Sequence, residues 1–379
     1  MKLWPNSDST KTLLVLDISS GSVGAGIIRI ESKNTIPSIL STTRVPLYLT
    51  NKPNSESIEK ALLKSIREAV GNIYKTNVDK VLISFSSPWI TSRLRTFIQK
   101  SDKPFSVDQK FILNILKKEE ADFTKDLSKR YVEESKTFDS KITNVTLNGY
   151  ESNMAVPQKT TDLEIQFMMY ACQESLINKI ETEITNLIGV RNGLILENFM
   201  FVFMKVFTKT FHNMHSVLLV NMSNEALDLL LVKDAYPLVS ISLPFGPAYI
   251  ARTIQKELGV SLEVAYSYID LFTDGVLNLE TSFKIDNILK KIKTEWSDTW
   301  IKVTSEIPKD KVIPYKIFLI SSAQNETIIK TLLSGAFNNH KVEQIEKNSE
   351  LVKFIAKYTS RAKVDERISI LGAYSNLCS

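Results

Sequence analysis

The chain has 379 residues, of which 43% are hydrophobic and 23% are charged. This composition is typical of a globular protein that is large enough for two or more domains. Its 47 basic and 42 acidic residues leave a net charge of +5, which is too small over this length to indicate nucleic-acid binding.

The N-terminal part of the chain predicts three strands, a helix and a fourth strand. The segment LVLDISSGSVGAGIIRI (14–30) consists of an apolar strand, a polar turn and a second apolar strand. A third strand is expected at 38–50, a helix at 58–73 and a strand at 78–86. The turn places Asp17 beside hydroxyls and free backbone amides, which suits a metal-bound phosphate. The alternative is a hairpin turn with a capping aspartate.

The pattern of expected strands and helices changes between 87 and 162, which predicts a compact insert. An extended segment is followed by a helix at 106–123, where Ser106 and Gln109 match a capping box. Strands are then expected at 140–150 and 162–171. A segment of about 75 residues is above the usual lower limit for a small domain.

The opening pattern then returns in the second half of the chain. The segment LLVLDISSGSVGAGIIRI (13–30) aligns with VLLVNMSNEALDLLLVKD (217–234), which lies 204 positions later. Asp17 aligns with Asn221, Ser19 with Ser223 and Ser20 with Asn224. A third strand and a helix again follow, at 236–246 and 247–259. A repeat of this length predicts two similar domains that face each other. The other expected elements are helices at 174–189, 199–207, 285–307, 327–335 and 364–379 and a strand at 315–322, which a polar turn at 323–326 follows.

Two such units, with each turn aimed at the gap between them, resemble the plan of the actin-like ATPases. The chain is similar to the bacterial actin homologues of cell division (FtsA type) and of type IV pilus assembly (PilM type). The resemblance implies an α/β, actin-like (ribonuclease H-like) duplicated two-domain fold with a small α+β domain inserted in the first half. It implies a first actin-like domain at 11–86 and 167–205, the insert at 87–166, a second domain at 206–361 and a C-terminal helix at 362–379 that returns to the first domain.

The resemblance also implies a nucleotide site between the halves. DISSGS (17–22) matches the first phosphate loop, NMSNEALDLLL (221–231) the second, and IFLISSAQNE (317–326) the adenosine-binding strand and loop. Asp17 would orient water around Mg²⁺ bound with ATP. The candidate cofactor-binding residues are Asp17, Ser19, Ser20, Gly21, Ser22, Asn221, Ser223, Asn224, Gly246, Ser321 and Ser322.

These loops depart from the family pattern. Ser19 stands where the family usually has glycine, the second loop has no glycine, and Ser321 and Ser322 replace a glycine pair. Asn221 stands where the family has an aspartate, which would weaken magnesium binding and slow phosphoryl transfer. The sequence therefore predicts at most a slow ATPase. Two alternatives are an interaction module that has lost nucleotide binding and a sugar kinase of the same superfamily.

The expected role is that of a cytoplasmic scaffold that a partner recruits to the inner face of the membrane. The opening MKLWPNSDSTK lacks the apolar run of a signal peptide, and no segment reaches the roughly 18 to 20 apolar residues that span a bilayer. Cys172 and Cys378 are predicted to be reduced thiols. The resemblance implies a membrane-anchored division or pilus protein as partner, and self-association into filaments or dimers, without nucleic acid or direct membrane insertion.

Overall fold

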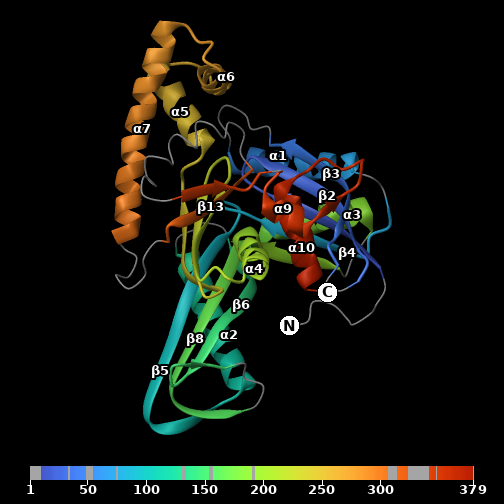
Figure 1. Cartoon of the computed structure of the whole chain (residues 1–379), viewed down its shortest axis with the longest axis vertical. Coiled ribbons are helices and arrows are strands. Elements are labelled where there is room, and N and C mark those ends of the chain that lie inside the picture. Colours follow the sequence, from blue (N-terminus) through green and yellow to red (C-terminus); the bar gives the residue numbers. More distant parts are fainter. Residues whose placement is uncertain are drawn as a thin grey trace.

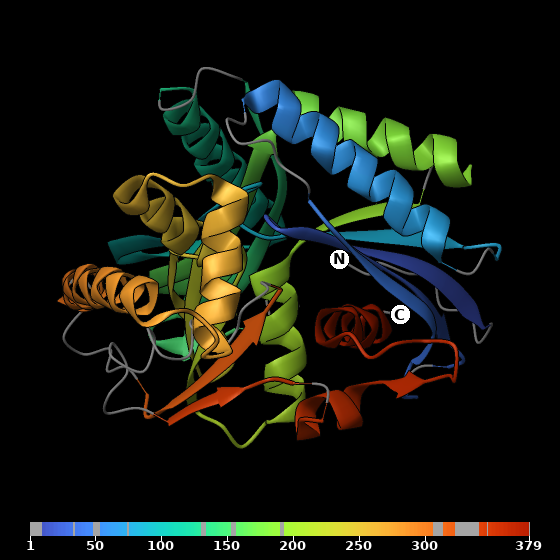
Figure 2. The same ribbon diagram turned by 90° about the horizontal axis from the view of Figure 1, so that it is seen from above.

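Three β-sheets organise the protein in the computed structural model (Figures 1 and 2). The structure describes residues 10–32, 35–47, 54–73, 76–129, 134–152, 157–189, 193–305, 314–322, 341–346 and 348–378. The first two sheets lie in the main body of the molecule, and the third projects from it at the lower end of Figure 1.

The first sheet has the strand order β15–β3–β2–β1–β4–β9. β1, β2 and β3 form an antiparallel meander, and β4 and β9 continue the sheet parallel to β1. β15 pairs with the other edge, parallel to β3. The strands are β1 (Lys11–Ile18), β2 (Ser22–Ile30), β3 (Ser38–Pro46), β4 (Lys80–Phe85), β9 (Leu194–Asn198) and β15 (Lys357–Tyr358).

The second sheet has the order β12–β11–β10–β13–β14 and repeats this plan. β10 is antiparallel to β11 and parallel to β13, just as β1 is antiparallel to β2 and parallel to β4. The predicted internal repeat is therefore present in strand order and strand direction. The strands are β10 (Ser216–Met222), β11 (Leu227–Lys233), β12 (Tyr236–Leu243), β13 (Lys316–Ser321) and β14 (Lys341–Gln344).

Helices cover both faces of the first sheet. α1 (Ser55–Asn72) and α3 (Glu174–Ile188) pack together on one face, and α4 (Phe199–Thr210), α9 (Glu350–Ile355) and α10 (Glu366–Leu377) pack on the other. α4 and α10 lie side by side between the first two sheets (Figure 2). The apolar side chains of α4 pack against both sheets, so one hydrophobic core joins the two halves.

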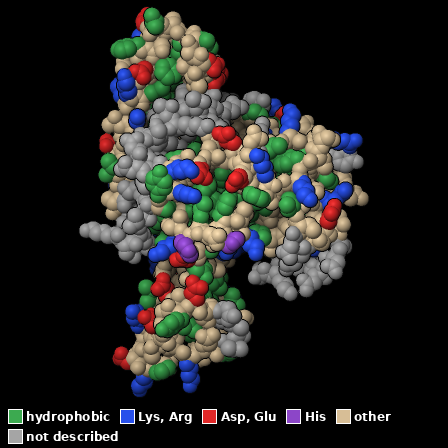
Figure 3. All heavy atoms as spheres, viewed as in Figure 1, with side chains coloured by type: hydrophobic (Ala, Val, Ile, Leu, Met, Phe, Trp, Pro, Cys, Tyr) green, Lys and Arg blue, Asp and Glu red, His purple; other side chains and the backbone are tan. Residues whose placement is uncertain are grey.

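The helices of the second half form a lobe at the upper end of Figure 1. Its members are α5 (Pro247–Leu258), α6 (Leu262–Thr273) and α7 (Leu279–Ser305). Trp296 and Trp300 of α7 pack against the second sheet. Apolar side chains reach the surface of this lobe (Figure 3). Leu279 and Phe283 of α7 are exposed. Basic and acidic side chains are interspersed over the face shown in Figure 3.

The third sheet, with α2 (Gln109–Ser128) on one face, is named the insert here. Its strand order is β5–β8–β6–β7, with β5 (Thr91–Val107), β6 (Ser135–Leu147), β7 (Tyr150–Glu151) and β8 (Gln158–Gln173). The predicted capping box at Ser106 is wrong, because the backbone stays extended through Val107 and Asp108 caps the helix. The division of the chain into domains at the boundaries given above stays a prediction.

Several expected elements lie outside the described residues. These are the polar turn at 323–326 and the helix expected after it. The predicted stop of a helix at Gly189 is confirmed, since this residue ends α3 with a φ of 74°. Within the described part of the chain, no helix combines the length and the apolar character that crossing a membrane requires.

Candidate functional site

The two turns that the repeat aligns have the same local structure. In the first turn, the backbone N–H and the hydroxyl of Ser19 both donate to the carbonyl of Ser22, each at 3.1 Å. In the second turn, the N–H and the hydroxyl of Ser223 donate to the carbonyl of Ala226, at 2.9 and 3.0 Å. Serine is therefore used at both positions to close the turn with its own hydroxyl.

The structure brings the two turns into direct contact. The N–H of Glu225 donates to the Ser20 hydroxyl at 2.8 Å, and the hydroxyl of Ser322 donates to that of Ser19 at 3.0 Å. A Cβ added at Gly21 would lie 2.6 Å from the Cβ of Asn224. One backbone amide and the hydroxyls of Ser19, Ser20 and Ser322, which could otherwise contact a phosphate, are therefore used between the two turns.

Gly246 supports the second turn from behind. A Cβ at this position would lie 2.2 Å from the backbone oxygen of Asn224, so only glycine allows the two segments to approach so closely. Ser321 ends β13 beside Met222, at the mouth of the second turn. The eleven candidate residues from the two halves thus surround one junction.

Asp17 lies at the centre of this junction and is fully buried. Its carboxylate accepts two hydrogen bonds from Arg367, at 2.6 Å from Nε and 2.7 Å from Nη2. It accepts a third from Nη2 of Arg44 at 2.9 Å. Burial opposes ionisation of Asp17, but the charges and hydrogen bonds of the two arginines outweigh it and hold its pKa below the usual value.

Arg44 links Asp17 to the start of α10. Its Nε and Nη2 atoms donate to the carboxylate of Asp365, the N-cap of that helix, and its Nη1 donates to Ser22. Burial disfavours the Arg44 cation, but Asp365 and Asp17 outweigh that effect and raise its pKa. Two carboxylates and two guanidinium groups therefore balance one another here.

Asn221 is the counterpart of Asp17 in the second half and is also fully buried. Its side-chain oxygen accepts a hydrogen bond from Arg367, and its amide nitrogen donates to Asp228 at 3.0 Å. Asp228 accepts a further hydrogen bond from the hydroxyl of Ser242 at 2.6 Å. An aspartate at 221 would place two carboxylates in contact at this point, so asparagine suits the network.

The described part of the site does not fit a magnesium-bound phosphate in this arrangement. Both oxygens of Asp17 already accept hydrogen bonds from guanidinium groups, which would repel a divalent cation. The carboxylate of Glu225 is held by Arg252, with contacts of 3.0 and 2.8 Å. Binding of ATP and Mg²⁺ by the candidate residues stays a prediction that these contacts do not favour.

Sequence reasoning missed Arg367 and Arg44, which dominate the electrostatics of the junction. Arg367 is only 1% exposed although it lies in the first turn of a helix whose start, VDERIS, looks solvated. Arg44 lies in β3 after two threonines that are half-buried, as Arg44 itself is. The one available signal is a basic residue directly before the apolar run ISILG, and it does not identify a partner 350 positions away.

A second charge cluster, built around the buried Glu197, connects the insert to the first half. Lys141 of β6 contacts Glu197 at 3.1 Å and Asp139 at 2.8 Å, and the Tyr374 hydroxyl donates to Glu197 at 2.7 Å. Burial raises the pKa of Glu197, and Lys141 opposes this only in part. The cluster fixes the base of the insert against α10.

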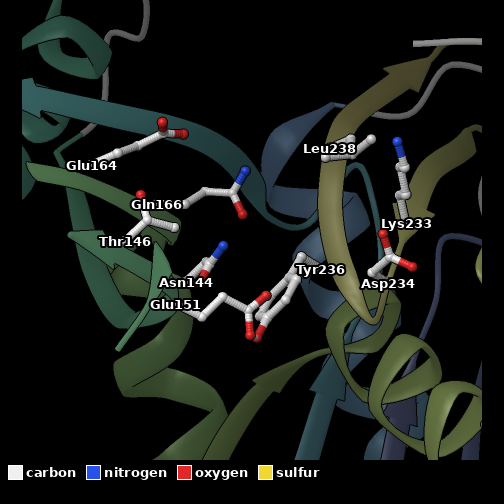
Figure 4. Close-up of a pocket in the computed structure, with 9 residues that line it drawn as sticks. All are labelled: Asn144, Thr146, Glu151, Glu164, Gln166, Lys233, Asp234, Tyr236 and Leu238. Carbon is white, nitrogen blue, oxygen red and sulfur yellow. Dashed lines mark hydrogen bonds between the residues drawn. The ribbon is translucent and has the colours of Figure 1, made fainter. Parts of the chain in front are cut away.

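The insert also meets the second half around a polar pocket of about 280 Å³ (Figure 4). Side chains of β6 and β8, such as Asn144 and Gln166, face Tyr236 and Leu238 of β12. The Tyr236 hydroxyl donates to Glu151 at 3.0 Å across this pocket. Most side chains that line this contact are polar, in contrast to the apolar core between the first two sheets.

No protein-family model and no curated protein sequence matches the chain. Among solved structures, a chain of the PilM–PilN type IV pilus biogenesis complex matches with a TM-score of 0.64 and 14% identity over 99% of this chain and 97% of that chain. The ethanolamine utilization protein EutJ from Carboxydothermus hydrogenoformans matches with a TM-score of 0.43 and 7% identity, over 90% of this chain and 86% of that one.

A Bacteroides thetaiotaomicron protein with an actin-like ATPase fold and unknown function matches with a TM-score of 0.42 and 11% identity, over 96% of both chains. These last two scores are too low to carry an argument. The first match and the duplicated sheet order establish the actin-like fold that the sequence resemblance predicts.

Proposed function

We propose that this protein is an actin-like scaffold of a type IV pilus assembly system, which docks to a membrane-anchored partner without using ATP. The likeness to a chain of the PilM–PilN complex extends over 99% of the sequence and supports the pilus system. It also supports a PilN-type protein as partner and a location at the cytoplasmic face of the membrane. The cell-division role is the alternative within the same fold.

The observation that carries the ATP-independent part of the proposal is the contact between the two turns. Arg367 and Arg44 occupy the carboxylate of Asp17, and Ser20 occupies the N–H of Glu225. Phosphoryl transfer depends on neutralising phosphate charge with metal ions and donors in the cleft. Here those donors are used within the protein, which argues against both a brisk ATPase and a sugar kinase.

Binding to the partner tests the proposal directly. The full-length protein is titrated into a fluorescent peptide that carries the cytoplasmic segment of the PilN-type protein of the same genome, and anisotropy is measured with and without Mg-ATP. We expect saturable binding with the same affinity in both conditions, and no binding to a scrambled peptide. Binding that requires Mg-ATP, or none at all, would contradict the proposal.

Two further measurements separate the alternatives. Co-sedimentation with polymers of the cell-division tubulin homologue would support the division role instead, and we expect the protein to stay in the supernatant. Calorimetry with millimolar ATP and Mg²⁺ should detect no binding heat. Self-association into filaments or dimers stays a prediction, which sedimentation velocity of the purified protein tests.

A further inference from the structure

Arg367 connects the two halves of the molecule through one side chain. Its helix, α10, packs against β1 and β2, and its Nε and Nη2 atoms hold Asp17 at the end of β1. Its Nη1 atom donates to Asn221 at the end of β10, in the second half. The guanidinium group therefore lies between the ends of the two equivalent strands.

The guanidinium group is held in place from several directions. Besides Asp17 and Asn221, it donates from Nη2 to the Ser86 hydroxyl at 2.8 Å. Its central carbon lies 3.5 Å from the centre of the Phe199 ring, which closes one face of the planar group. A planar cation with this many fixed partners is rigid, which suits it to fix the spacing of two structural elements.

The second half anchors its end of this contact equally firmly. Asn221 donates a hydrogen bond to Asp228, which also accepts one from the Ser242 hydroxyl at 2.6 Å. The Asp228 carboxylate lies 3.4 Å from the backbone nitrogen of Ser87, just after β4 in the first half. The Ser223 hydroxyl, at 3.2 Å from the Ser87 carbonyl, makes a second return contact to the first half. The hydrogen bonds thus run from the first half through Arg367 to the second half, and from the second half back to Ser87 of the first half.

We propose that Arg367 is a built-in cross-link that holds the two halves in a closed arrangement when no nucleotide is present. In this protein a side-chain cation does what a metal-bound phosphate would otherwise do, which is to attract both strand ends at once. The relative position of the halves is therefore fixed by the sequence and does not respond to ATP. This inference concerns the junction alone and does not depend on which partner the protein binds.

Distance measurements by electron resonance between two spin labels test the cross-link. The labels are placed at Glu68→Cys in α1 and Asp270→Cys in α6, two exposed positions in different halves, in a background with Cys172→Ala and Cys378→Ser. With Arg367 present, we expect one narrow distance distribution that is unchanged by millimolar Mg-ATP. Arg367→Ala should broaden the distribution and extend it to longer distances.

Two variants keep the test decisive. Asn221→Ala removes the anchor in the second half and leaves the Arg367–Asp17 contact intact, so it answers the question even where Arg367→Ala does not fold. Arg44→Ala is the matched control, because within the described part of the chain this arginine donates to Asp17, Ser22 and Asp365, which all lie on the side of the first half. It should keep the narrow distribution.

The proposal is overturned by either of two results. One is a distance distribution in Asn221→Ala that equals the distribution with Asn221 and Arg367 in place, which would mean that the cross-link does not set the distance between the two halves. The other is a shift on addition of Mg-ATP while Arg367 is present, which would mean that nucleotide controls closure.

Discussion

The guanidinium group of Arg367 holds the carboxylate of Asp17 through two contacts of 2.6 and 2.7 Å, although 350 positions separate the residues. Their exposed fractions are 1% and 0%. A buried bidentate pair of this kind contributes little net stability compared with an apolar pair, but loss of either partner leaves an uncompensated charge in the interior. Variants that remove one partner should therefore have large effects.

Arg367→Ala should lower the free energy of unfolding by about 3 to 5 kcal/mol, because Asp17 would lose its main partner inside the protein. Urea denaturation followed by circular dichroism measures this change. The matched control is Arg67→Ala, whose contact to Glu183 is also 2.7 Å but whose side chain is 54% exposed. The control should change stability by less than about 1 kcal/mol, and equal effects of the two variants would contradict the assignment.

Asn221→Leu should cost about 1 to 3 kcal/mol, because it removes the acceptor of the buried Arg367 Nη1 and the amide that donates to Asp228, which then keeps only its contacts with Ser242 and Ser87 among the described residues. The same denaturation experiment measures the loss. Asn114→Leu on α2 makes the same chemical change at an exposed position and should be nearly neutral. A leucine at 221 that is tolerated as well as one at 114 would show that the polar network is dispensable.

The effect of Asp17→Asn should depend on pH in a defined direction. A carboxyl group with a lower pKa in the folded protein contributes stability in full above its unfolded pKa, about 3.9, and that stability is lost as pH falls through the folded pKa. The stability difference from the unmodified protein should therefore stay constant from pH 7 to about 4 and shrink only below that.

Urea midpoints between pH 7 and 2.5 measure this difference, with Asp270→Asn at an exposed position as the control. A difference that grows as pH falls from 7 to 5 would show that the folded pKa of Asp17 lies above its unfolded value, and a difference that stays constant down to pH 2.5 would show an unshifted pKa; either result would mean that the arginines do not hold Asp17 ionised.

Gly246→Ala should be destabilising by about 1 to 3 kcal/mol or more, because the new methyl group would meet the backbone oxygen of Asn224 at 2.2 Å. Gly71→Ala is the matched control, since it lies in α1 with no atom within 4 Å of the new methyl group. The control should be neutral or stabilising by up to about 1 kcal/mol, through helix propensity. Thermal melts of both variants test the contrast.

The internal repeat could be predicted because each copy has a recognisable pattern of apolar and polar residues along the chain. The alternation of apolar strands around a polar turn at 14–30 and 217–234 is sufficient to indicate equivalent hairpins. The alignment of Ser19 with Ser223 is confirmed by their identical turn hydrogen bonds. The order of the strands within each sheet follows from the fold that these hairpins resemble.

The chemistry at the junction could not be predicted in the same way. Asp17 reads as a metal-site carboxylate because nothing near it in the sequence neutralises its charge. Its actual partners come from β3 and α10, and only the folded chain brings Arg44 and Arg367 to it. The pairing depends on the burial of Arg367, which looks solvated in the sequence but lies inside the protein.

The position of α10 also bears on how the protein is made. Asp17 leaves the ribosome long before Arg367, so the nascent first sheet carries a central carboxylate whose principal counter-ion has not been synthesised. A product truncated before residue 366 would keep that defect permanently. It would expose the face of the first sheet that α10 covers and become a substrate for cellular proteases. Only a chain translated through this helix can therefore complete the junction and escape degradation.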